Sequence, residues 1–207
     1  MKNIKTLTHS ILIAAVAFNL TMCNSSHGDK HNKASDTTIA AGSPKNTDAC
    51  LVPVSAEDSA KYISKQVAVS GDVEHPLTLT VDSLKAMNVV TIENFVVVCQ
   101  SGARMKEDKT CKGVLLKDIL EKAKIKQQGH KDRNFYIVAR ATDNYKATFS
   151  WGEIFNNPTG ENVYVLFEEN GKPIKAQGDM ILISKNDIKT GPRHVYWLKS
   201  IEVNRIE

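Results

Sequence analysis

Short apolar runs separated by turn residues dominate this sequence from about Lys65 onward. Four of the runs are continuous and rich in β-branched and aromatic side chains: residues 95–99, 135–139, 163–167 and 180–184. Each is too short for a free-standing helix, so each predicts a strand buried in a sandwich or a mixed sheet. Residues 66–70, 77–81 and 195–203 carry related patterns and are predicted as further strands.

Helical patterns are few and short. Asp82 is placed to N-cap a turn over residues 83–87. Residues 114–123 put their apolar side chains on one stripe and their charged ones on the opposite face, which predicts an amphipathic helix. Residues 151–155 are predicted as a single helical turn. The sequence therefore predicts an α+β fold dominated by strands.

Residues 1–23 have the pattern of an export signal. Two lysines near the N-terminus precede an apolar run over residues 11–20. This run is shorter than the roughly 20 residues that a helix needs to span a bilayer. The run ends in Leu-Thr-Met-Cys, which resembles a bacterial lipobox with Cys23 as the acylated residue. Met22 is larger than the residue usually found before that cysteine, so a plainly cleaved secretory signal and an uncleaved anchor stay open. We expect an exported protein, periplasmic or on the outer surface, held at the membrane by a lipid anchor.

Residues 24–64 are predicted to be a flexible tether and a lead-in to the domain. Residues 24–49 carry almost no large apolar side chains, so they cannot offset the entropy that is lost on ordering. His27 and His31 lie four residues apart in this tether, and a solvated linker explains them without a metal. The folded domain is predicted to span residues 65–207.

Composition and charge narrow the function. The chain is 42% hydrophobic and 24% charged, which excludes disorder of the whole chain. The net charge is only +4, and two of the lysines belong to the export signal, so no nucleic acid partner is expected. A hydrolase and a zinc site are not predicted either, because the domain has neither a nucleophile elbow nor a Cys or His pair at zinc-ligand spacing.

Four segments resemble, in order, the molybdopterin-binding domain of the sulfite oxidase family. They are VCQSGAR at residues 98–104, KGVLLKDIL at 112–120, VYVLF with NGKPI within 163–174, and GPRHVYWL at 191–198. The resemblance runs from about Val69 to Val203. Each motif alone is weak, but the four together follow the order and spacing of that family.

The resemblance implies a role for Cys99. In that family a single protein thiolate binds molybdenum, which is otherwise held by the dithiolene of a tricyclic pterin, and Cys99 occupies the matching position. It would be the metal ligand, and the catalytic residue if molybdenum is bound, because a soft thiolate suits such a metal. Two alternatives stay open: Cys99 is one more buried apolar residue, or it forms a disulfide with Cys111 in an oxidising compartment.

The sequence also departs from the enzymes of that family. The arginine expected to bind the cofactor phosphate is Leu182, the nearby histidine is Gln177, and the lysine of the last motif is Tyr196. An aliphatic side chain does not replace an arginine on a phosphate. The chain also stops at Glu207, without the dimerisation domain of the large enzymes. These losses lie on the phosphate and substrate side.

Three functions follow from this pattern. The first is an exported module that binds an unphosphorylated pterin and reports it to a membrane-bound signalling partner. The second is a small oxidoreductase that depends on the molybdenum cofactor and has a separate redox partner. The third is a structural or adhesion module that kept the fold and lost the ligand.

A pterin needs a flat apolar face and hydrogen-bonding groups along its aminopyrimidine edge. We expect Trp151 against the ring, and Glu153 or Asp187 as acceptors from the edge; core packing and solvated loop carboxylates are the alternatives. Arg104 and Arg193 would donate to a carbonyl oxygen. The predicted cofactor-binding set is Cys99, Ser101, Arg104, Trp151, Glu153, Asp187, Arg193 and His194, with His194 as a proton shuttle or an ordinary loop histidine. Trp197 is predicted to belong to the core.

Overall fold

The computed structural model of the protein describes residues 60–105 and 107–207. The predicted export signal, the acylated Cys23 and nearly all of the tether lie outside the described residues, and the domain boundary at residue 65 stays a prediction. The strands are β1 (Val67–Gly71), β2 (Leu77–Leu79), β3 (Val89–Phe95), β4 (Lys109–Leu115), β5 (Phe135–Ala141), β6 (Lys146–Ser150), β7 (Val163–Glu169), β8 (Lys172–Pro173), β9 (Ile181–Ser184) and β10 (Leu198–Arg205). The helices are α2 (Val81–Lys85), α3 (Leu116–Ala123) and α4 (Trp151–Phe155), with 3₁₀ turns η1 (Pro158–Asn162) and η2 (Gly191–Arg193).

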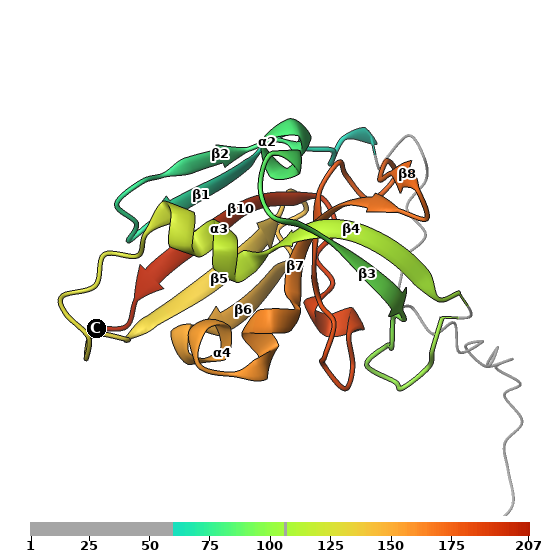
Figure 1. Ribbon diagram of the computed structural model, residues 1–207. Coiled ribbons are helices and arrows are strands. Elements are labelled where there is room, and N and C mark those ends of the chain that lie inside the picture. Colours follow the sequence, from blue (N-terminus) through green and yellow to red (C-terminus); the bar gives the residue numbers. More distant parts are fainter. Residues whose placement is uncertain (1–59, 106) are drawn as a thin grey trace, which may run out of the picture. The chain divides into compact units, whose positions relative to one another are not determined.

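The strands form two sheets (Figure 1). The first has the order β2-β1-β10-β5-β6, with β10 parallel to β1 and antiparallel to β5. The second has the order β3-β4-β7-β8, and β9 also pairs with β7; all of its pairs are antiparallel. The strand-dominated α+β architecture agrees with the prediction from the apolar runs.

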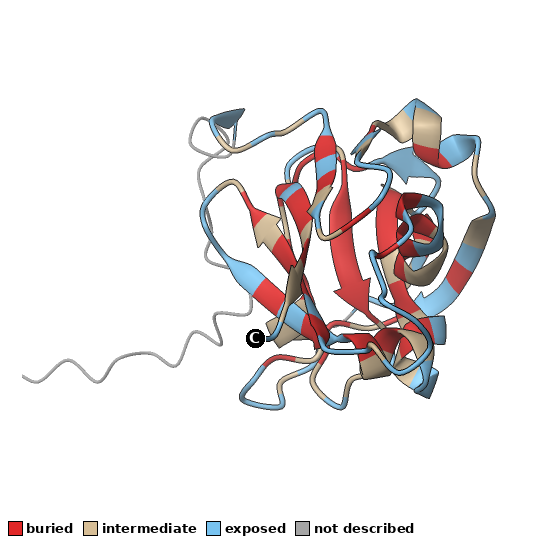
Figure 2. Cartoon of the chain, turned by 90° about the vertical axis from the view of Figure 1, so that its left-hand side faces the viewer, coloured by how far each residue is buried: buried red, intermediate tan, exposed pale blue. Residues whose placement is uncertain are grey.

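The main hydrophobic core contains side chains of both sheets together with the apolar stripe of α3. Leu116, Ile119, Leu120 and Ala123 are buried, as the periodicity predicts. Figure 2 shows the buried residues concentrated along the strands and the exposed ones along the loops. Among the described residues no helix is long and apolar enough to cross a membrane.

The second sheet has apolar side chains buried on both faces. Along β7, Val163 and Val165 belong to the main core, whereas Leu166 belongs to a second cluster that also contains Cys111. Every residue of β9 is buried. This explains why the runs over β7 and β9 are continuous rather than alternating.

The predicted strand over residues 95–99 is wrong. The chain is extended earlier, along β3, and the register of its pairing with β4 shifts between Ile92 and Phe95. Asn94 has a left-handed φ of 54° and lies within this shift, and the ladder ends at Phe95. Val98 then makes only an isolated bridge to Arg104. Cys99 therefore lies on a loop and not at the end of a strand.

Two helix starts also differ from the prediction, and a third helix agrees with it. Thr80 rather than Asp82 caps α2, because its side chain accepts from Ser83 N while Ser83 in turn accepts from the backbone of Thr80. The helix predicted over residues 114–123 begins at Leu116, because the two residues before it belong to β4. The predicted turn over residues 151–155 coincides with α4.

The last strand begins at Leu198 because the chain changes sheets just before it. Val195 makes an isolated bridge to Leu182 of β9, in the second sheet, whereas Leu198 pairs with Ala141 in the first sheet. Trp197 lies at the crossing with a left-handed φ of 46°. Its backbone passes so close to Gly178 that a Cβ there would lie 3.0 Å from the Trp197 Cα, so the chain needs a glycine at this point.

Candidate functional site

Cys99 lies in a tight loop between β3 and β4. The loop closes on itself through two backbone hydrogen bonds: Cys99 N donates to Ala103 O at 2.8 Å, and Gly102 N donates to Cys99 O at 2.9 Å. Gly102 has a φ of 92°, a conformation that glycine adopts readily. The Cys99 residue itself is only 6% exposed, so its sulfur faces the protein rather than solvent.

The sulfur of Cys99 takes part in a disulfide bond. Cys111 is a free thiol, buried on β4, so the partner sulfur lies outside the described residues. The predicted alternative of a Cys99–Cys111 disulfide is therefore wrong. Cys111 lies in the second apolar cluster, and burial together with the nearby Glu169 raises its pKa to about 12.

A second loop holds the cysteine loop from the side. The hydroxyl of Thr190 accepts a hydrogen bond from Val98 N at 2.8 Å and donates one to Val96 O at 2.9 Å. The next residue, Gly191, donates its N–H to Val98 O at 2.8 Å. The ammonium of Lys189 donates to Gln100 O. Residues 189–191 thus supply hydrogen bonds to the backbone of residues 96–100, which follows the end of the β3–β4 pairing.

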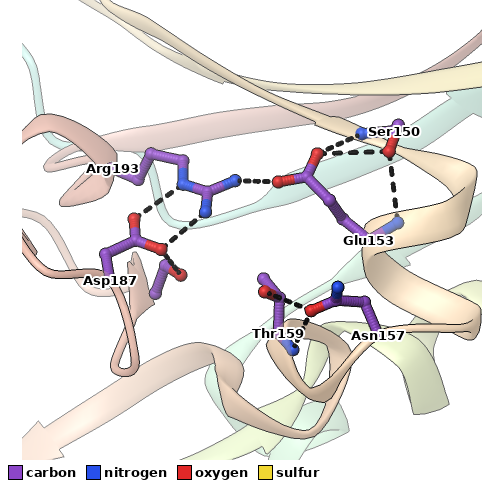
Figure 3. Close-up of polar contacts among 7 residues, drawn as sticks. Ser150, Glu153, Asn157, Thr159, Asp187 and Arg193 are labelled. Carbon is purple, nitrogen blue, oxygen red and sulfur yellow. Dashed lines mark hydrogen bonds and ion pairs between the residues drawn. The ribbon is translucent and has the colours of Figure 1, made fainter. Parts of the chain in front are cut away.

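The same loop continues into a three-residue ion cluster around Arg193, shown in Figure 3. The guanidinium donates from Nε and Nη2 to the two oxygens of Asp187, at 2.7 and 2.5 Å, and from Nη1 to Glu153 Oε1 at 2.9 Å. Its carbon also lies 4.4 Å from the ring centroid of Phe149 on β6. These bonds, chiefly those with Asp187, raise the pKa of Arg193. The cluster therefore ties the loop before η2 to α4.

Glu153 is held by the start of its own helix. Ser150 caps α4 and donates to Glu153 Oε2 from its backbone N, at 2.8 Å, while its hydroxyl accepts from Glu153 N at 3.1 Å. Burial alone would raise the pKa of Glu153, but the bonds from Ser150 and Arg193 outweigh it and lower that pKa. The carboxylate is thus ionised and oriented before any ligand arrives.

The structure brings three of the predicted residues together: Glu153, Asp187 and Arg193. Arg193 forms ion pairs with both carboxylates, whereas the sequence predicted that each of the three residues would contact a ligand. The cysteine loop joins the same region through residues 189–191, and it carries the exposed Ser101 and Arg104.

Trp151 lies apart from the Arg193 cluster. Its ring stacks on Phe155 with centroids 5.0 Å apart, and Arg133 lies 5.1 Å from its centroid. It lines a groove of about 440 Å³ between α3 and α4, with Leu120 and Ile125 among the other lining residues. Glu153 follows two residues after Trp151, and such positions face different sides of a helix. The predicted stacking of Trp151 on a pterin stays a prediction.

His194 is buried, with 5% exposure, and neither of its ring nitrogens has a hydrogen-bond partner among the described residues. Its ring lies 4.4 Å from that of Tyr196 and 5.8 Å from that of Phe95, centroid to centroid. Burial, assisted by the charge of Lys109, lowers its pKa to about 3. His194 is therefore neutral at ordinary pH, and its predicted role as a proton shuttle stays a prediction.

Sequence reasoning missed Thr190, Phe149 and Ser150. The Ser-x-x-Glu spacing of Ser150 and Glu153 was a readable capping-box signal. Thr190 gave no signal, because its partners lie more than 90 positions earlier in the chain.

The donor set does not fit a molybdenum cofactor in this state of the protein. A disulfide sulfur has no thiolate to offer a metal, and Leu182, at the position of the family's phosphate-binding arginine, is fully buried in the main core. Within the described part of the chain, no group of three or more Cys, His, Asp or Glu side chains is placed to hold a metal ion.

Comparison with known proteins identifies a family and similar solved structures. A family model described as "Oxidoreductase molybdopterin binding domain" covers residues 52–207. Among solved structures, the chain is similar to the sulfane dehydrogenase SoxCD from Paracoccus pantotrophus, with a TM-score of 0.52 and 18% sequence identity; the match covers 74% of this chain and 40% of that one. No curated protein sequence matches the chain. The structural match shows the fold alone, and it confirms the predicted fold of the sulfite oxidase type.

Proposed function

Because this chain belongs to the oxidoreductase molybdopterin binding domain family, we propose that it is an exported pterin-binding module and not a complete molybdenum enzyme. In this proposal the chain is held at the membrane through Cys23 and reports the bound pterin to a membrane-bound partner. The observation that carries the proposal is the disulfide at Cys99.

The disulfide removes the one protein ligand that the family offers to the metal. Molybdenum would need the thiolate of Cys99, and the sulfur is already bonded to another sulfur. The thiol of Cys111 is no substitute, because it is buried among apolar side chains and its pKa is raised to about 12.

The phosphate side of the site supports the same proposal. Leu182 pairs with Val165 within the second sheet and has no exposed surface, so an arginine at this position would have to leave the core to meet a phosphate. A pterin without a phosphate makes no such demand.

Arg193 retains some capacity to bind a ligand. A guanidinium has five N–H donors, and three of them are bonded to Asp187 and Glu153. The other two can donate to a carbonyl oxygen such as that of a pterin. The carboxylates around them fix the guanidinium in place, which lowers the entropy cost of binding.

Analysis of the protein purified from the envelope of its own host tests the proposal. We expect a pterin fluorophore after oxidation, less than a tenth of an equivalent of molybdenum by elemental analysis, and Cys99 in disulfide form by peptide mapping. Near-stoichiometric molybdenum with a reduced Cys99 would contradict the proposal and favour the oxidoreductase. Absence of both ligands, or absence of the protein from the envelope, would also refute it.

A titration with tetrahydrobiopterin, followed by tryptophan fluorescence, tests the role of Arg193. We expect Arg193→Gln to weaken binding about tenfold, which is the effect of losing roughly one charge-assisted hydrogen bond. Arg205→Gln is the matched control, since Arg205 also lies 4.4 Å from a phenylalanine ring and pairs with an aspartate, Asp132. Equal losses in both variants would assign the effect to stability and not to the site.

A further inference from the structure

The segment just before Cys99 depends on another loop for its conformation. After Phe95 the chain leaves the β3–β4 ladder. Among residues 60–105 and 107–207, the segment 96–98 then has no strand partner except the isolated bridge between Val98 and Arg104. An unpaired backbone group in the interior costs about as much as a lost hydrogen bond. Thr190 satisfies two of these groups, Val98 N and Val96 O.

Thr190 is well placed for this role. It is only 4% exposed, and its single hydroxyl both accepts from Val98 N and donates to Val96 O, at 2.8 and 2.9 Å. Gly191 N reaches Val98 O at 2.8 Å. Three backbone groups of the segment before Cys99, two of them on the adjacent Val98, are thus fixed by two neighbouring residues of a distant loop.

We propose that Thr190 is the positioning residue of Cys99: its hydroxyl holds the cysteine segment in the conformation in which the Cys99 disulfide forms. The inference rests on the proposed function, in which Cys99 works as a disulfide and not as a metal ligand. It deepens that function, because the same loop carries Arg193 three residues later.

As a consequence, the redox state of the Cys99 disulfide and the conformation of the loop that carries Arg193 depend on each other. Linkage is reciprocal, so if the Thr190 contacts favour the disulfide, the disulfide favours the Thr190 contacts by the same factor. Reduction of the disulfide then loosens residues 189–191, and with them the turn η2 that carries the Arg193 guanidinium. A pterin bound at Arg193 is therefore held more tightly by the oxidised protein than by the reduced one.

The redox step is an ordinary thiol–disulfide exchange. One thiolate of an external dithiol attacks one sulfur of the Cys99 disulfide, which breaks the protein S–S bond, releases the other protein sulfur as a thiolate and forms a mixed disulfide. The second thiol of the reagent, as its thiolate, then attacks the reagent sulfur of the mixed disulfide and releases the remaining protein thiolate. Two electrons pass from the dithiol to the protein, whose disulfide becomes two thiols, and the dithiol leaves as its own disulfide.

The test compares the reduction midpoint of the Cys99 disulfide among variants of the full chain without ligand. The protein is equilibrated in buffers of reduced and oxidised dithiothreitol, and the reduced fraction is read by alkylation and mass analysis of the Cys99 peptide. Thr190→Val removes both hydroxyl bonds with little change in shape, and Thr190→Ser retains the hydroxyl. Thr142→Val is the matched control, since the Thr142 hydroxyl bonds a distant backbone carbonyl, that of Tyr62, away from the cysteine loop.

We expect Thr190→Val to favour reduction about tenfold, which for two electrons is a rise of about 30 mV in the midpoint. Thr190→Ser and Thr142→Val should stay within twofold of the wild type. An unchanged midpoint in a folded Thr190→Val protein would overturn the proposal, and so would an equal shift in Thr142→Val.

Hydrogen exchange in the wild-type protein keeps the proposal testable if Thr190→Val does not fold. We expect the Val98 amide to be protected in the oxidised protein and to exchange at least tenfold faster after reduction. Equal protection in both states would refute the link. Neither measurement uses a pterin, so failure of pterin binding would overturn the proposed function alone.

Discussion

His194 should make the fold markedly less stable in acid. Its imidazole is neutral and enclosed, with 5% exposure, and neither nitrogen has a hydrogen-bond partner among the described residues. The charged group that lowers its pKa further is Lys109 on β4. A buried oxygen of Glu169 on β7 also has no hydrogen-bond partner within the part of the chain that the structure describes. A proton added to this ring would place an unpaired charge in the interior.

The size of the effect follows from the pKa. It is about 3 in the folded protein against 6.5 for an ordinary histidine, so between these values the unfolded chain binds the proton and the folded chain does not. Stability is then lost as the pH falls through this window. The loss from His194 is about 3 kcal/mol at pH 4 and approaches about 5 kcal/mol below pH 3, since one pKa unit corresponds to about 1.4 kcal/mol.

Urea unfolding at pH 7 and pH 4 measures this loss. Several carboxylates with lowered pKa values, such as Glu202 at about 2, also lose stabilisation in acid, so the informative quantity is the difference between wild type and His194→Phe. Phenylalanine fills the space and does not titrate. We expect the unfolding free energy of the variant to rise relative to wild type by about 3 kcal/mol between pH 7 and pH 4. His75→Gln, at an exposed histidine, should follow the wild type.

A constant difference between wild type and His194→Phe over this range would refute the reasoning. It would mean that the folded protein either protonates His194 as readily as the unfolded chain does or holds its charge with a partner. Chemical shifts of the His194 ring protons, followed from pH 7 to pH 4, would then identify which of the two is true.

Two further predictions concern buried positions. Leu182→Arg, which restores the cation of the family, should lower the free energy of unfolding in urea by about 4 kcal/mol or more, because it places an unpaired charge in the core. Ile188→Arg, at a position 93% exposed, should leave that free energy unchanged. A stable Leu182→Arg protein would show that this position can reach the surface. The thiol of Cys111, with a pKa of about 12 and no exposed surface, should not react with a disulfide reagent at pH 8 until the protein is unfolded, and rapid labelling of the native Cys111 peptide would contradict its burial.

Local patterns predicted the elements well, because each reflects neighbours in the chain. The apolar runs of β5, β7 and β9 are buried strands, and the predicted single turn over residues 151–155 is α4. The capping pair Ser150 and Glu153, which the prediction did not use, lies three residues apart and is equally local. The run over residues 95–99 misled because apolar content alone does not reveal that the β3–β4 register shifts at Asn94 and that the ladder ends at Phe95. Phe95, Val97 and Cys99 are buried as predicted, but Val96 and Val98 are only partly buried and the predicted strand pairing is absent from this segment.

The site was predicted only in part, because its contacts join distant positions. The sequence singled out Glu153, Asp187 and Arg193, but not that they bond one another, since Glu153 and Arg193 lie 40 positions apart. Thr190 was invisible for the same reason. Nothing in a polar loop shows that one hydroxyl will satisfy two backbone groups of a segment more than 90 positions earlier.

The position of β10 in the first sheet bears on the order in which the protein can fold. It lies between β1 and β5 and pairs with both, although it follows them both in the sequence. A chain made from its N-terminus therefore cannot join the β1–β2 hairpin to β5 and β6 until residues 198–205 have been synthesised. Pairings over such long separations also form slowly. The first sheet thus stays incomplete until almost the last residue of the chain has been added, whereas the second sheet contains no strand after β9.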